Sequence, residues 1–137
     1  MKRMYSRLWP RVALLSAVAA AILVLSLIPD PPIELGWLAN ADKVQHWVAY
    51  LVLGFLVYLT IQHGEKRRLA IVGLSVALCT IYGGLIEVLQ TFTGRSADAI
   101  DFFVNMFGAS AGAVASLGSV EISIDSKRRR TGRATGL

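Results

Sequence analysis

One short span of the chain gathers many of the polar side chains that could perform chemistry. Carboxylates can act as general acids or bases, and a nearby arginine or lysine can bind phosphate. Between residues 83 and 105 these side chains are Glu87, Gln90, Arg95, Asp98, Asp101 and Asn105. Apolar segments flank the span, and a charge inside a bilayer costs at least ~2.5–3.5 kcal/mol. We therefore expect these groups to have partners or a function.

Four apolar segments must position these side chains. The helices that we predict cover about 12–28, 44–62, 69–90 and 100–120. About 20 helical residues cross the ~30 Å hydrocarbon core of a membrane. A soluble helical bundle would need polar helix faces, which these segments lack. The sequence thus predicts an all-α fold, an integral membrane four-helix bundle over 12–120, between a basic tail at 1–11 and a basic, disordered tail at 121–137.

The first apolar segment has a second interpretation, because a basic start followed by an apolar run is typical of a cleaved signal peptide. The Ala39-Asn40-Ala41 sequence would be the cleavage site, but it lies far beyond the run, behind three prolines. This placement favours an uncleaved first helix. The single cysteine, Cys79, excludes an internal disulfide and a cysteine-based zinc site.

The basic residues are distributed unevenly along a chain whose formal net charge is +5. Most of the fourteen lysines and arginines lie in the N-terminal tail, the 63–68 connection and the C-terminal tail. Short connections rich in lysine and arginine stay in the cytoplasm. We therefore predict both termini in the cytoplasm and the connections 29–43 and 91–101 outside it. This placement of charge indicates a topology signal and not a nucleic-acid partner.

Spacing of three and four residues puts polar side chains on one face of each of the last three predicted helices. The stripe of the second helix contains Lys43, His46, Tyr50, Gly54 and Tyr58, with Asp42 one turn before His46. The third stripe contains Thr80, Gly83, Glu87 and Gln90. The fourth contains Asp98, Asp101, Asn105, Gly108 and Gly112.

The alternating directions of the helices bring the polar ends of these three stripes to the same leaflet. We infer that they form one polar pocket that opens outward. Glu87 would lie below the surface, where Arg95, Lys43 or a protonated His46 could supply a neighbouring cation. Small residues allow close helix packing, and the expected packing positions are Gly54, Gly83, Gly84, Gly108 and Gly112.

Two of these motifs together resemble the VanZ-like family. The first is Asp42-Lys43-Val44-Gln45-His46, followed by Tyr50 and Gly54. The second runs from Gly84 through Glu87 and Gln90 to Gly94-Arg95, Asp98, Asp101, Asn105 and Gly108. The family is named for a small membrane protein associated with teicoplanin resistance. The resemblance covers roughly 42–112 and implies a multi-pass protein of the bacterial cytoplasmic membrane, without specifying a reaction.

The first functional hypothesis is that the pocket binds or processes a lipid-linked cell-envelope molecule. Lys43, Arg95 and a protonated His46 would contact phosphate, and Glu87 or Asp101 would act as general acid or base. No serine or cysteine with an obvious activating base is present, so covalent catalysis has no support and the question of enzymatic activity stays open.

Three alternatives differ from this hypothesis. A metal site could use Asp42, His46, Glu87, Asp98 and Asp101, but one histidine among scattered acids is a weak signature. The sequence therefore predicts no metal and no cofactor. The polar residues could instead form an ion-pair network in a structural or regulatory partner of envelope enzymes. Transport ranks last, because four short helices offer little for alternating access.

Overall fold

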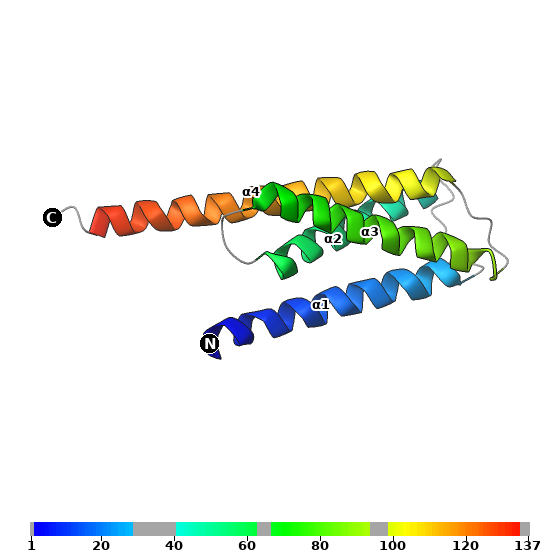
Figure 1. Cartoon of the computed structure of the whole chain (residues 1–137), viewed down its shortest axis with the longest axis horizontal. Coiled ribbons are helices and arrows are strands. Elements are labelled where there is room, and N and C mark those ends of the chain that lie inside the picture. Colours follow the sequence, from blue (N-terminus) through cyan, green and yellow to red (C-terminus); the bar gives the residue numbers. More distant parts are fainter. Residues whose placement is uncertain (1, 29–40, 63–66, 94–98, 135–137) are drawn as a thin grey trace.

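The computed structural model describes residues 2–28, 41–62, 67–93 and 99–134. These residues form four helices: α1 (Lys2–Leu27), α2 (Ala41–Ile61), α3 (Arg68–Gln90) and α4 (Ala99–Ala134). The helices alternate in direction, so the beginning of α1 and the end of α4 lie at the same end of the bundle (Figure 1). The predicted all-α four-helix fold is confirmed, and the described ranges contain no strand.

Each of the four described helices contains a segment long and apolar enough to cross a membrane. These segments are Leu8–Leu27, Asp42–Ile61, Arg68–Gln90 and Ala99–Ser123. Large apolar side chains such as Trp9, Ile81 and Phe107 are exposed on the outside of the bundle. An outer surface of this kind is suited to lipid and not to water.

The ends of the helices differ from the predicted ends mainly in the two tails. α1 already begins at Lys2, and Pro10 lies within it. α4 continues to Ala134 (Figure 1), whereas the sequence predicted a disordered tail from residue 121. No proline interrupts 121–134, and its glutamate, lysine and arginine residues favour helix. The basic C-terminal segment therefore extends α4 well past its membrane-spanning part.

The α2–α4 pair forms the closest helix crossing, and three glycines make it possible. A Cβ atom at Gly54 of α2 would collide with the carbonyl oxygen of Ala109. On α4, Cβ atoms at Gly108 and Gly112 would collide with the carbonyl oxygens of Trp47 and Leu51. The two backbones therefore touch directly along the crossing, as small residues in membrane helices allow.

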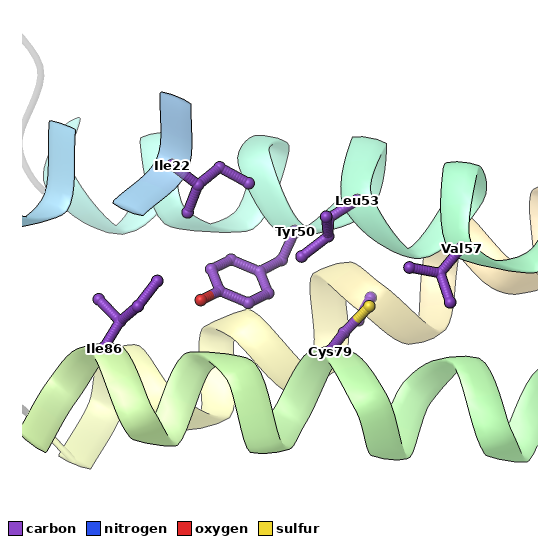
Figure 2. Close-up of a cluster of buried hydrophobic side chains, with 7 residues drawn as sticks. Ile22, Tyr50, Leu53, Val57, Cys79 and Ile86 are labelled. Carbon is purple, nitrogen blue, oxygen red and sulfur yellow. The ribbon is translucent and has the colours of Figure 1, made fainter. Parts of the chain in front are cut away.

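Buried side chains between α2 and α3 complete the core. Tyr50, Leu53 and Val57 of α2 face Cys79 and Ile86 of α3 (Figure 2). The free Cys79 is buried in this cluster, which agrees with a small packing side chain.

The first helix is more loosely attached than the other three. Ile22 is the only buried residue among the described side chains of α1. Two side chains of α3 donate hydrogen bonds to its backbone, from Tyr82 to the Ala19 carbonyl at 2.7 Å and from Gln90 to the Ser26 carbonyl at 2.9 Å. These bonds fix α1 against α3.

The crossing predicts opposite effects for the same substitution at two glycines of α4. Gly112→Ala places a methyl group against the Leu51 carbonyl, and we expect it to destabilise the fold by about 1–3 kcal/mol. Gly118 has open space around it, so Gly118→Ala should be neutral or stabilising by up to about 1 kcal/mol. Unfolding by denaturing detergent measures both values. Equal effects of the two substitutions would contradict the close crossing.

Candidate functional site

The first turns of α2 and α4 bring polar side chains into direct contact. The Lys43 ammonium lies 3.2 Å from the Asp101 carboxylate. Nδ1 of His46 lies 3.0 Å from Oδ1 of Asn105. Both helices begin at the same end of the bundle, so their N-terminal turns are neighbours. We call this group the α2–α4 polar cluster; its members are Asp42, Lys43, His46, Asp101 and Asn105.

Carboxylates at the helix starts are favoured by the local backbone. Asp42 lies in the first turn of α2 and Asp101 in the first turn of α4. The exposed backbone N–H groups at the start of a helix carry a partial positive charge that stabilises a carboxylate. Lys43 then adds a full positive charge beside Asp101. Two helix ends and one ammonium thus hold two negative charges close together.

The hydrogen bond to Asn105 determines where the proton of His46 lies. The Oδ1 atom of an asparagine can only accept, so Nδ1 of His46 must donate. In the neutral ring, Nε2 then carries a lone pair. This Nε2 atom faces Asp42, with 3.8 Å between it and the carboxylate oxygen, which is beyond hydrogen-bond distance.

Burial differs strongly within the cluster. The side chains of His46 and Asp101 are each 10% exposed, and Asn105 is 1% exposed. Lys43 is 29% exposed and Asp42 is 52% exposed. The cluster therefore has a buried inner part, with His46, Asp101 and Asn105, and a more exposed outer part, with Asp42 and Lys43.

One atom each from Asp42, His46 and Asp101 lie within 4.8 Å of one another. A carboxylate oxygen, an imidazole nitrogen and a second carboxylate oxygen can bind a cation, accept protons or accept hydrogen bonds from hydroxyl groups. Glu87, which the sequence added to this possible ligand set, is not part of the group found among the described residues, and Asp98 lies outside those residues.

The third helix contributes Gly83 and Glu87 beside the cluster. A Cβ atom at Gly83 would lie 3.1 Å from the Tyr50 hydroxyl and 3.3 Å from the Asn105 amide nitrogen. Glu87 is buried one turn further along α3, within electrostatic range of Tyr50. The polar stripes of α2, α3 and α4 therefore meet at this end of the bundle, through Tyr50, Gly83 and Asn105.

The other predicted site residues have different positions. Gln90 is buried but directs its amide to the backbone of α1. A Cβ atom added at Gly84 would lie 3.5 Å from the Phe102 ring. Arg95 and Asp98 lie outside the described residues.

Two features were absent from the predicted site. Tyr50 was assigned only to a helical stripe, although its hydroxyl lies against Gly83 beside Asn105. Its position four residues after His46 was the available signal. At the opposite end of the bundle, Arg68 of α3 pairs with Glu121 of α4 at 3.0 Å. No pattern in the sequence indicated this pair, because Arg68 lies in the basic 63–68 connection and Glu121 in the predicted C-terminal tail.

These helices define a multi-pass membrane protein in which a polar cluster lies where α2 and α4 begin. The family model described as VanZ/LLP1 matches residues 9–119, so the chain belongs to the VanZ/LLP1 family. The resemblance seen over 42–112 is confirmed and extends over all four membrane-spanning segments. No curated protein and no solved structure matches the chain.

The two ion pairs predict different coupling energies in double-mutant cycles. Lys43→Gln with Asp101→Asn should give a coupling of about 1.5–3 kcal/mol, because Asp101 is mostly buried. Arg68→Gln with Glu121→Gln should give about 0.2–1 kcal/mol, because Glu121 is 55% exposed. Unfolding in detergent measures both cycles. A coupling at the Arg68 pair as large as that at the Lys43 pair would contradict this assignment of burial.

Proposed function

We propose that the chain binds the headgroup of a lipid-linked cell-envelope molecule, such as a glycan precursor, at the extracytoplasmic leaflet. The α2–α4 polar cluster is the observation that carries this proposal. It combines an ammonium, two carboxylates, an imidazole and an amide at one end of membrane-spanning helices. Asp42 and Lys43 are partly exposed and offer the first contacts to a ligand.

The chemistry of the cluster suits a headgroup that contains both hydroxyl groups and phosphate. The carboxylates of Asp42 and Asp101 accept hydrogen bonds from sugar hydroxyls. Lys43 donates to a phosphate oxygen in a charge-assisted hydrogen bond. The buried His46–Asn105 pair holds the floor of the site in place. A simple acyl chain would satisfy none of these groups.

Exposed apolar side chains beside the cluster suit the lipid part of the same molecule. On α2 they are Val44, Trp47 and Val48, and on α4 they are Ile100, Phe103 and Phe107. An amphipathic ligand can therefore place its headgroup against the cluster while its chain lies along the lipid-facing surface. The fit of both parts favours a membrane-embedded ligand over a soluble one.

A non-enzymatic structural or regulatory role is the second candidate. The Lys43–Asp101 and His46–Asn105 contacts join α2 to α4 and would stabilise the fold without any ligand. In that case the chain would act as a membrane partner of envelope enzymes. The two candidates differ in whether the exposed part of the cluster contacts a lipid headgroup.

The distribution of basic residues supports an outward-facing cluster and predicts the topology. Arg67 precedes α3 and Arg68 begins it, at the end of the bundle opposite to Lys43 and Asp101. Since basic connections stay in the cytoplasm, a reporter fused to the C-terminus should be active only in the cytoplasm. A reporter that is active outside would reverse the orientation and place the cluster at the inner leaflet.

Retained lipids provide the main test. Protein purified in a mild detergent should carry a recurrent lipid-linked glycan phosphate that mass spectrometry identifies. Lys43→Gln should reduce its amount by about tenfold or more, because one charge-assisted contact is lost. Glu121→Gln removes an ion pair at the opposite end and serves as the matched control, with retention unchanged.

The outcomes separate the two candidates. Bulk phospholipid alone, equally retained by the unmodified chain and Lys43→Gln, would contradict lipid binding at the cluster. If Lys43→Gln also lowered the stability in detergent, the structural candidate would be supported. Loss of the glycan lipid from a Lys43→Gln protein that keeps its helical content would support the proposed function.

A further inference from the structure

We propose that Asp42, His46 and Asp101 bind one divalent transition-metal ion, Zn²⁺ or Mn²⁺, between α2 and α4. The juxtaposition of their ligand atoms within 4.8 Å, across two helices, is the primary observation. The inference of an ion rests on this geometry and on the orientation of His46. Its role toward a headgroup rests on the function proposed above.

The distances are close to those of a metal centre. Zinc lies about 2.0–2.2 Å from nitrogen and oxygen ligands, so two ligands of one ion are at most about 4.4 Å apart. In a tetrahedral shell two ligands are roughly 3.4 Å apart. The three atoms lie within 4.8 Å of one another, so they need to approach by up to about 1.4 Å. Asp42 is half exposed, so a change of its side-chain rotamer can supply part of this movement.

His46 has the orientation that a metal-binding histidine requires. Metal-bound histidines almost always donate their other ring N–H to a carbonyl or carboxylate, which fixes the tautomer. Here Nδ1 donates to Asn105, which is almost completely buried, and Nε2 faces the carboxylate of Asp42. The imidazole is itself nine-tenths buried, so its position is fixed before the ion arrives. This arrangement distinguishes the group from a chance collection of acids.

The charge balance also favours a cation. The group contains two carboxylates, and the one ammonium of the cluster, on Lys43, lies 3.2 Å from an oxygen of Asp101. Lys43 therefore neutralises part of the negative charge of the carboxylates, and a divalent metal ion would neutralise more of it. Its side chain is 29% exposed and long enough to turn outward when the ion binds. Lysine and metal ion thus compete for Asp101.

A bound ion would remove an electrostatic difficulty in the proposed function. Without it, Asp42 and Asp101 repel a phosphate that approaches Lys43. Three protein ligands leave at least one position of a tetrahedral or larger shell open, as in catalytic zinc sites. Oxygen atoms of a phosphate or a sugar can occupy this position. The ion then joins the acidic cluster to an anionic headgroup.

The ligand set favours Zn²⁺ or Mn²⁺ over the alternatives. An imidazole nitrogen with carboxylate oxygens suits these ions, whereas Ca²⁺ and Mg²⁺ prefer oxygen alone. The thiol of Cys79 is buried in the core between α2 and α3 and is not part of the ligand group. The site therefore does not favour a metal ion that prefers thiolate ligands.

Metal titration of the full chain tests the site without any added lipid. Metal-stripped protein in detergent is titrated with Zn²⁺ by calorimetry and with Mn²⁺ by electron paramagnetic resonance. We expect one ion per chain and coupling of Mn²⁺ to an imidazole nitrogen. His46→Gln and Asp42→Asn should each weaken binding by at least about tenfold. His63→Gln replaces the other histidine of the chain and should leave the affinity unchanged.

Lys43→Gln gives a result that an ion-pair network alone would not produce. Removing the competing ammonium should strengthen metal binding several-fold, whereas Glu121→Gln should have no effect. The proposal is overturned if the unmodified chain binds no ion, or if His46→Gln and Asp42→Asn bind as tightly as the unmodified chain. Circular dichroism shows whether each variant keeps its helices, and Asp42→Asn, at a half-exposed position, is the variant least disruptive to the fold.

The lipid experiment and the metal experiment can each contradict one proposal without contradicting the other. One bound ion without a retained glycan lipid would support the metal site and contradict the proposed function. A retained glycan lipid that survives metal removal, with no ion bound, would support the function and contradict the metal site.

Discussion

The close crossing of α2 and α4 is the contact on which the other polar interactions depend. Gly54, Gly108 and Gly112 lack side chains at the positions where the two backbones meet. The first turns of the helices are therefore near enough for side chains to reach across. In hydrocarbon each isolated charge would cost at least ~2.5–3.5 kcal/mol, and the crossing supplies partners for Lys43 and Asp101.

The two ends of the bundle differ in chemistry because they differ in burial. At one end, the His46–Asn105 bond lies in the interior and Gly83 of α3 lies against Asn105. At the other end, the exposed Arg68–Glu121 ion pair joins α3 to α4. A buried polar group must be satisfied by fixed partners, whereas an exposed one can be hydrated. The buried end is therefore the more specific of the two and the better suited to recognition.

Membership of the VanZ/LLP1 family describes the architecture of this chain. The arrangement of its side chains indicates which chemical groups that architecture makes available to a ligand. The site combines acceptors, one ammonium and a histidine of fixed orientation, beside an apolar surface that faces lipid. Such a site matches a molecule with a polar headgroup and an apolar chain. The proposed metal ion would let the same carboxylates contact an anionic headgroup that they would otherwise repel.

The sequence by itself determined the four helices, because long apolar segments and the spacing of polar residues are local properties. It also indicated that Asp42, His46, Asp101 and Asn105 belong to polar helix faces. Only the tertiary structure decided which faces meet. Gln90 shares a stripe with Glu87 yet donates to the backbone of α1. Helical spacing defines a face but neither the rotation of a helix nor the neighbour that the face contacts, and those depend on packing at the glycine crossing.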